Sequence, residues 1–301
     1  MVVDPSELVD SRVKRDEIPA ILDPRFTKRS DLRGDEEVLG VSWQGESKAY
    51  PLRILNYHEV VNDRLGATPV LIAYCPLCHS GTGYVRKVQG RELHFGVSGK
   101  LYRNDLVLYD QETESLWVEM LGECIQGPLQ GTVLERIPVD HVEWGSWKMV
   151  FPGSDVLDPP GGFPYETDPY SSYLHSREIK YPRSAIASPG GPHPKEIVLG
   201  IELKGEAKAY PVFLLREVMV INDVLGGERI VVAQYEGVYR AWKRPAFEFK
   251  VFEGGHMDDP EGEHWERITG KGRKGSLERV PTNLAFWFAW KDLHPETTLF
   301  G

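Results

Sequence analysis

The sequence predicts a mainly β (α+β) protein made of two tandem β-rich domains related by internal duplication, with a degenerate second copy. Three observations support this prediction. Residues 38–51 return as residues 198–211, with nine of fourteen positions identical. A length of 301 residues fits two domains of about 150 residues each. Short runs of β-branched and aromatic residues alternate with Gly, Asn and Asp, as in strands joined by turns.

The repeat continues beyond this segment. Three more pairs of segments match: 60–66 with 220–226, 71–73 with 231–233, and 134–138 with 277–281. The second copy has none of the three cysteines of the first copy. A duplication followed by decay of one site explains this difference, and a repeat of this length has the size of a domain. Residues needed only for the fold should survive in both copies.

The repeat also sets the expected domain boundaries. We expect an N-terminal arm at 1–34, a first repeat at 35–152, a linker at 153–195 and a second repeat at 196–301. The arm is mostly charged, and we expect it to be extended, with a short helix around 6–15 at most. The linker is so rich in Pro and Gly that no regular element is expected in it. Its tyrosines are expected to pack across both halves: Tyr165, Tyr170, Tyr173 and Tyr181.

The first repeat is expected to begin with a β-hairpin over 38–51, with its turn at 44–46. Apolar residues at three- and four-residue spacing predict a short helix over 51–63. The β-branched content of 68–74 predicts a buried strand that ends at Cys75. Further elements follow in order: strands at 83–88, 92–97, 106–110, 116–120 and 131–138, and a helix at 144–150 that is matched by 285–293 in the second repeat.

Charge and hydropathy exclude several classes of partner. The net charge of −10 argues against nucleic acid or an anionic membrane as a partner. No run of eighteen apolar residues occurs, so no membrane span is expected. The N-terminus has no signal segment, so the chain as written is expected to be cytoplasmic, or extracytoplasmic if a leader was removed. The oligomeric state is left open.

The cysteines are the first candidates for chemistry. Cys75 and Cys78 are spaced to chelate one soft metal or to form a disulfide. With Cys124 as a third ligand and His79 as a fourth, the chain could hold copper or zinc, which thiolates favour. Two alternatives are a dithiol redox pair with Cys75 as the nucleophile, and inert buried thiols.

A second group of candidates follows the cysteines. Residues 98–105 carry two cations and several hydrogen-bonding side chains, where the second copy has only Glu-Gly-Gly-His-Met-Asp at 253–258. We expect either a plain polar hairpin loop or a pocket whose cations hold a small anionic ligand. The candidate ligand-binding residues are Ser98, Lys100, Arg103, Asn104, Asp105 and Asp110.

Other polar residues are given weaker roles. His58, His94 and His141 are expected to be surface or satisfied core histidines. Glu119 could be functional or solvated, because its counterpart is Arg267. No Gly-rich phosphate loop, H-E-x-x-H helix or G-x-S-x-G elbow occurs, so no motif supports a kinase or hydrolase.

Several motifs resemble a bacterial and archaeal family known as a conserved domain of unknown function. They are Y-C-P-L-C at 74–78, F-G-V-S-G-K-L at 95–101, N-D-L-V-L-Y-D at 104–110, T-E-S-L-W at 113–117 and G-P-L-Q-G-T at 127–132. The resemblance covers roughly 21–202 and implies no established activity. Members usually have a small or polar residue after C-P-L-C, so His79 departs from the pattern and is not implied as an obligatory ligand. Many members look exported, which keeps an extracytoplasmic location open.

Three functions therefore stand as hypotheses. The leading one is a thiolate metal site, with copper or zinc, that supports binding or redox chemistry on a small anionic ligand. The second is a metal-free thiol oxidoreductase that uses the Cys75 and Cys78 pair. The third is a non-enzymatic module that only binds a ligand.

Overall fold

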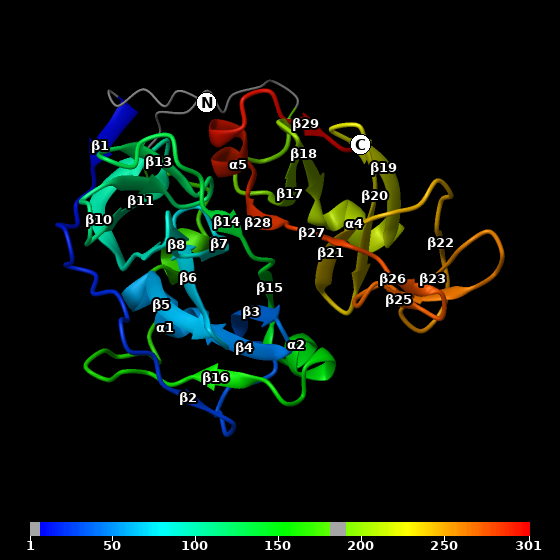
Figure 1. The fold of residues 1–301 in the computed structure, drawn as a ribbon, viewed down its shortest axis with the longest axis horizontal. Helices are drawn as coiled ribbons and strands as arrows, with labels where there is room; N and C mark the ends of the chain where they lie inside the picture. Colours follow the sequence, from blue (N-terminus) through cyan, green and yellow to red (C-terminus); the bar gives the residue numbers. More distant parts are fainter. Residues whose placement is uncertain (1–6, 181–190) are drawn as a thin grey trace.

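The computed structural model describes residues 7–180 and 191–301, and it confirms a mainly β protein. This part of the chain forms 29 strands and five short helices. The two repeats lie side by side, with β28 and α5 at their boundary (Figure 1). None of the helices in these residues is long and apolar enough to cross a bilayer.

The first repeat is built on two sheets that enclose one core. One sheet has the order β15-β3-β4-β16-β2 and the other β14-β7-β6-β5. Between them lies a buried cluster that includes Leu39, Ile54 and Ile72. The bounds of these elements are β2 Phe26–Thr27, β3 Glu37–Trp43, β4 Glu46–Pro51, α1 Leu52–His58, β5 Val60–Leu65, β6 Thr68–Cys75, β7 Ser80–Val85, β14 Glu135–Arg136, β15 Asp140–Glu143, α2 Trp144–Val150 and β16 Asp155–Leu157.

The second repeat has the same element order and the same strand register. Val38 pairs with Pro51 in the first repeat, and Val198 pairs with Pro211 in the second. Its sheets have the orders β28-β17-β18-β29 and β19-β20-β21-β27. The bounds are β17 Ile197–Leu203, β18 Glu206–Pro211, α4 Val212–Val218, β19 Val220–Leu225, β20 Glu228–Tyr235, β21 Val238–Lys243, β27 Arg279–Val280, β28 Asn283–Phe286, α5 Trp287–Leu293 and β29 Thr298–Leu299. Gene duplication as the origin of this repeat stays an interpretation.

One turn differs between the repeats. The hairpin of β6 and β7 pairs Cys75 with Ser80, whereas the hairpin of β20 and β21 pairs Tyr235 with Val238. The first repeat therefore uses four turn residues, 76–79, where the second uses two, 236–237. The longer turn carries Cys78 and His79, and His79 adopts a positive φ of 54°. Non-glycine residues with positive φ are strained and often mark functional sites.

A second difference is a lobe of strands that is larger in the first repeat. It consists of β1 Leu8–Asp10, β8 Lys87–Val88, β9 Arg91–Glu92, β10 Phe95–Tyr102, β11 Asp105–Asp110, β12 Leu116–Val118 and β13 Glu123–Gln126. The second repeat has β22 Lys250–Val251, β23 His256–Asp258, β24 His264–Glu266, β25 Lys271–Gly272 and β26 Gly275–Ser276 at this place.

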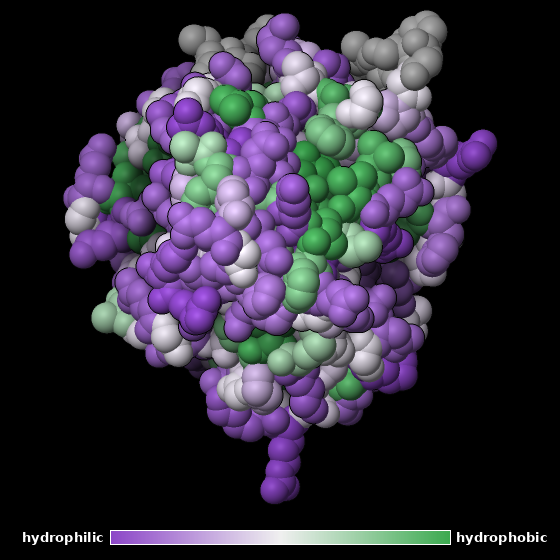
Figure 2. Space-filling view, turned by 90° about the vertical axis from the view of Figure 1, so that its right-hand side faces the viewer, coloured by the Kyte–Doolittle hydropathy of each residue, from purple (hydrophilic) through white to green (hydrophobic). Residues whose placement is uncertain are grey.

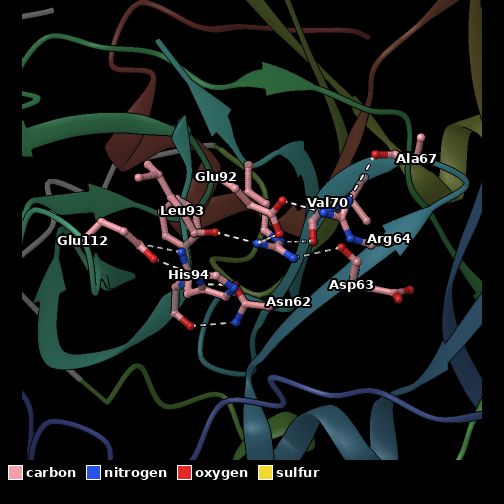
Figure 3. Close-up of polar contacts among 11 residues, drawn as sticks. Asn62, Asp63, Arg64, Ala67, Val70, Glu92, Leu93, His94 and Glu112 are labelled. Carbon is pink, nitrogen blue, oxygen red and sulfur yellow. Dashed lines mark hydrogen bonds and ion pairs between the residues drawn. The ribbon is translucent and has the colours of Figure 1, made fainter. Parts of the chain in front are cut away.

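A buried polar network fixes this lobe to the sheet of β5, β6 and β7 (Figure 3). The Asn62 side chain exchanges two hydrogen bonds with the backbone of Phe95. The Arg86 guanidinium donates to the carbonyl oxygens of Val70 and Leu93. In the second repeat, Asn222 bonds the backbone of Phe249 in the same way. These bonds are therefore part of the shared scaffold.

The local expectations are confirmed in part. The arm is extended as expected, since β1 pairs with the edge of β10, and the short helix allowed at 6–15 does not occur in residues 7–15. The helix expected over 51–63 ends at His58, because Glu59 adopts a left-handed conformation and the chain continues as β5. Much of the expected polar loop at 98–105 belongs to β10, and only Arg103 and Asn104 form its two-residue turn, both with positive φ.

The expected linker is also more regular than its composition predicted. It contains β16, which pairs in parallel with β4, and a short helix, α3 Ser171–Leu174. Tyr165, Tyr170 and Tyr173 contact groups of the first repeat: the His58 ring, the Glu59 carboxyl and the Leu77 carbonyl. Tyr181 lies outside the described residues. Few glycines or prolines fall within 155–157 and 171–174, which explains how these pieces can pair and coil.

The two repeats pack on each other through strands at their centre. β28 lies against β7, and β15 lies against β21. The Phe286 backbone N–H donates to the Cys78 carbonyl oxygen at 2.8 Å. A hydrophobic cluster also joins Trp147 of α2 to Val238 of β21. The turn that carries Cys78 and His79 is therefore held by both repeats.

The face of the second repeat carries apolar residues among polar ones (Figure 2). Its large exposed apolar side chains are Phe213, Val218, Val224, Val251 and Phe252.

A glycine under α2 gives a test of the scaffold. A Cβ added to Gly40 would lie 2.3 Å from the Trp147 ring, which is fully packed, and Gly200 faces Trp290 in the same way. We expect Gly40→Ala to lower the free energy of unfolding by about 1–3 kcal/mol, as overpacking does. Gly153→Ala is the control, because its added Cβ would meet no atom within 4 Å. Urea unfolding of both variants measures the difference; equal stabilities would contradict the expected clash.

Candidate functional site

The structure brings Cys75, Cys78 and Asp105 together. Cys75 ends β6, Cys78 lies in the long turn, and Asp105 begins β11. One potential ligand atom from each of the three lies within 4.8 Å of the other two. The three residues are at most 2% exposed. This group is called the thiol cluster below.

One carboxyl oxygen of Asp105 has a hydrogen-bond partner in the described chain and the other has none. Its Oδ2 accepts the Met120 backbone N–H at 2.8 Å. Its Oδ1 is buried and accepts no hydrogen bond from the residues that the structure describes. The Cys78 thiol donates to the Asn104 carbonyl oxygen at 3.2 Å. A buried carboxylate oxygen without a donor is costly, so a cation or a proton is the expected complement.

Glu119 adds a second buried carboxyl group beside the thiol cluster. Ser80 and Thr82 donate hydroxyl hydrogens to its two carboxyl oxygens. Burial, with the nearby charge of Asp105, raises the pKa of Glu119 well above its ordinary range. Burial also raises the pKa of Asp105 to about 6. Acidic groups therefore crowd this site.

The second repeat confirms how Glu119 and Arg267 correspond. Tyr84 donates its hydroxyl hydrogen to the Glu119 carbonyl oxygen at 2.8 Å, and Trp242 donates its indole N–H to the Arg267 carbonyl oxygen at 3.0 Å. The backbone is thus used alike in both repeats, whereas the side chains have opposite charge. The carboxyl group of Glu119 is therefore not part of the shared scaffold.

A small cavity reaches the thiol cluster through Cys75. Its volume is about 90 Å³, and its lining includes Cys75, Lys100, Glu59 and Tyr170. The Tyr170 hydroxyl donates to Glu59 Oε1 at 3.3 Å. Burial raises the pKa of Glu59 to about 8. The sequence analysis did not name Glu59 or Tyr170 as site residues. A signal existed for Glu59, because the second repeat has Met219 at the corresponding position.

Two expected metal ligands lie elsewhere. Cys124, on β13, is not among the ligand atoms gathered within 4.8 Å of Cys75 and Cys78. Its Sγ lies 3.5 Å from the Gln126 carbonyl oxygen, and burial raises its pKa to about 11. His79 joins a different cluster with Glu37 and His141. The structure therefore does not assemble a site from all three thiols and His79.

The expected anion-binding residues do not converge on one pocket either. Lys100 lines the cavity but pairs with Asp10 at 2.6 Å, and Arg103 forms an ion pair with Glu7. The remaining residues have local structural contacts: Ser98 donates to the Val107 carbonyl oxygen, Asn104 donates to Asp292, and Asp110 accepts from Thr113 and the Trp117 indole. Of the six, Asp105 belongs to the thiol cluster, Asn104 contacts it through its backbone carbonyl oxygen, and Lys100 lines the cavity.

The fold and the thiol cluster define the class of protein. It is a mainly β protein with two structural repeats, and the first repeat holds a buried group of thiols and carboxyl groups. The chain belongs to the family described as a protein of unknown function, DUF3179, whose model matches residues 15–297. This match confirms the family membership that the motifs predicted, and it spans both repeats. No curated protein and no solved structure matches the chain.

Proposed function

We propose that the protein is a metal-binding protein in which Cys75, Cys78 and Asp105 hold one zinc ion. The observation that carries this proposal is that one carboxyl oxygen of Asp105 lies within 4.8 Å of both sulfur atoms, while the buried Oδ1 of the same carboxyl group accepts no hydrogen bond from the described residues. Atoms bound to one zinc ion at about 2.0–2.3 Å lie roughly 3.3–3.8 Å apart. Zinc binding would therefore draw the three ligand atoms closer than the 4.8 Å limit within which they lie in the structure.

The donor set favours zinc over copper. Two thiolates alone would suit Cu(I), whereas a carboxylate oxygen is a harder ligand that Zn²⁺ accepts together with sulfur. A divalent cation would also favour the thiolate forms of the cluster, because burial raises the pKa of the Cys78 thiol well above its ordinary value. In this proposal Asp105 replaces Cys124 as the third metal ligand.

The cavity supports a ligand-binding role for this centre. A volume of about 90 Å³ at Cys75 fits a ligand of only a few atoms. Lys100 is a cation in its lining, and Glu59, with its raised pKa, can hold or release a proton near neutral pH. A small anionic ligand that enters beside Lys100 would meet the metal centre at Cys75.

A thiol oxidoreductase is the second candidate, and one observation favours it. Cys75 lines the cavity, whereas Cys78 is fully buried behind it. This is the arrangement of an attacking thiol and a resolving thiol. In such a step Cys75 attacks a substrate disulfide and releases one thiolate. Cys78 then displaces the second substrate thiol, which leaves a Cys75–Cys78 disulfide and two reduced substrate sulfurs.

Cobalt substitution separates these functions. We expect Co²⁺ added to the metal-free protein to give a sulfur-to-cobalt charge-transfer absorption band, which only thiolate ligation produces. Cys75→Ser, Cys78→Ser and Asp105→Asn should each lose or weaken this band, and Cys124→Ser should keep it. An unchanged band in Cys78→Ser would contradict the proposed ligands. No band at all, with fast reduction of a small disulfide by the metal-free protein, would establish the oxidoreductase instead.

A further inference from the structure

A second cluster of metal-ligating side chains lies between the repeats. Glu37 begins β3, His79 lies in the long turn before β7, and His141 lies on β15. β15 pairs with β3, which sets His141 beside Leu39 and Glu143 opposite Glu37. Ligand atoms of the three residues lie within 4.8 Å of one another. This group contains no sulfur and does not overlap with the thiol cluster.

The two histidines are buried and have few protein partners. His79 is 5% exposed and His141 is 8% exposed. His79 Nδ1 lies 3.2 Å from the Tyr74 hydroxyl, and its Nε2 lies 3.7 Å from the Glu37 carboxylate. Neither ring nitrogen of His141 makes a hydrogen bond within residues 7–180 and 191–301, although its Nε2 lies 3.4 Å from the same carboxylate. A buried imidazole without a hydrogen bond calls for an explanation such as an ion at the site.

The residue types of the cluster suit a metal ion. Imidazole nitrogens and a carboxylate oxygen are ordinary zinc ligands, and one such atom from each of the three residues lies within 4.8 Å of the others.

Two distances within the cluster are compatible with zinc. Glu37 Oε1 lies 3.4 Å from His141 Nε2 and 3.7 Å from His79 Nε2. Ligands bound at about 2.0–2.1 Å are roughly 3.3–3.4 Å apart at the edge of a tetrahedron. In an octahedron with bonds of about 2.1 Å the edge is only about 3.0 Å. Both separations are therefore nearer to the tetrahedral edge than to the octahedral one.

The cluster faces a cavity of about 470 Å³ that both repeats line. Strand register gives the counterparts of Glu37 and His141 in the second repeat, which are Ile197 and Leu284. Both of these apolar residues line the same cavity. The second repeat therefore has apolar residues at these two positions, although it also lines the cavity with Arg216, Gln234, Glu236 and Tyr239. The first repeat contributes all three candidate ligands.

We propose that Glu37, His79 and His141 form a second metal site, which binds one zinc ion through two imidazoles and a carboxylate. Three protein ligands leave a fourth position, as in catalytic zinc sites. That position would open to the cavity, whose lining includes Arg216, which donates to the Tyr239 hydroxyl at 2.8 Å, and also the acidic Glu143 and Glu236. A water molecule or another small oxygen-donor ligand is therefore the class that would complete the coordination.

The test uses the full chain with Cys75→Ser and Cys78→Ser, which removes sulfur ligation while the second cluster stays intact. We expect this double variant to bind one equivalent of zinc in competition with a chromophoric chelator. Adding His141→Leu introduces the residue found at the counterpart position 284. This change should weaken zinc binding by more than roughly 100-fold, the upper end of the loss seen when a residue that only supports a metal ligand is mutated. Adding His94→Ala, at an exposed histidine paired with Glu112, should leave zinc binding unchanged.

Two further measurements keep the test valid if a variant folds poorly. Imidazole NMR signals of the double variant should report zinc binding at two of the nine histidines, and Co²⁺ should give a tetrahedral spectrum without a sulfur band. Tyr74→Phe should weaken zinc binding by roughly 10–100-fold, because the hydroxyl orients His79. Zinc binding that perturbs no histidine, or binding of ferrous iron in preference to zinc, would overturn the assignment. If the cobalt-loaded original chain showed no sulfur-to-cobalt band, the proposal for the thiol cluster would fail, but the proposal for this second site would stand.

Discussion

Replacing Asp140 by Asn should cost about 3–5 kcal/mol in the free energy of unfolding. Asp140 is fully buried between two arginines of the second repeat: Arg240 donates to its carboxylate at 3.0 and 2.7 Å, and Arg279 at 2.5 Å. Removing one partner of a buried ion pair leaves uncompensated charge, which typically costs this much. In this variant two guanidinium groups would lose their carboxylate at the interface of the repeats.

The pH dependence of Asp140 follows from the same contacts. Burial by itself raises the pKa of this carboxyl group, but the charges of Arg240 and Arg279 outweigh burial and lower it. A lowered folded-state pKa means that the ion pair stabilises the protein above the unfolded pKa of about 3.9. The contribution is lost as the pH falls through the lower folded-state value.

Asp155→Asn is the matched control, because Asp155 pairs with Lys28 at 2.9 Å on the surface, where both side chains are at least 36% exposed. Surface pairs contribute about 0–1 kcal/mol. The free energy of unfolding of both variants is measured in guanidinium with a chelator present. The chelator prevents metal binding at the neighbouring His141 from affecting the comparison. Similar losses in the two variants would show that the Asp140 network does not hold the repeats together.

Local sequence patterns predicted much of the scaffold. The repeated hairpins at 38–51 and 198–211 and the strand that ends at Cys75 occur as expected, because alternation and turn residues act over a few positions. The helix after Pro51 was extended too far because apolar spacing continued past Glu59. Positive φ at Glu59 ends this helix, and Met219 ends α4 in the second repeat in the same conformation. Sequence gave no signal for that conformation, since neither residue is glycine.

The site depended on contacts that are remote in sequence. Cys75 and Cys78 were recognised from their spacing, and Asp105 was named as a ligand-binding residue, although its place beside the sulfurs required the register of β11. The residue type of Cys124 predicts a third ligand, but β13 pairs with its sequence neighbour β12, and Cys124 does not join the other two thiols. The place of His141 beside Glu37 depends on the pairing of β15 with β3, which are remote in sequence.

Glu59→Gln should stabilise the protein at alkaline pH and leave it nearly unchanged at pH 5. Burial raises the pKa of Glu59 from the ordinary 4.5 to about 8. A raised folded-state pKa means that folding is most favourable below about pH 4.5, where the carboxyl group is protonated in both states. Stability is then lost as the pH rises towards 8, because the unfolded state releases the proton first. The difference between the two pKa values, at about 1.4 kcal/mol for each pH unit, sets an upper limit of about 5 kcal/mol on this cost.

Gln keeps the size of Glu59 and can still accept the Tyr170 hydroxyl hydrogen, but it cannot ionise. Urea unfolding at pH 5 and pH 8.5, with a chelator present, should therefore show a pH-dependent loss in the original chain that is smaller by a few kcal/mol in the variant. Glu166→Gln is the control, since Glu166 is an exposed carboxylate 3.3 Å from Arg53. If the original chain and Glu59→Gln lose the same stability between the two pH values, Glu59 is ionised at neutral pH. It could then not supply a proton to a ligand in the cavity beside Cys75.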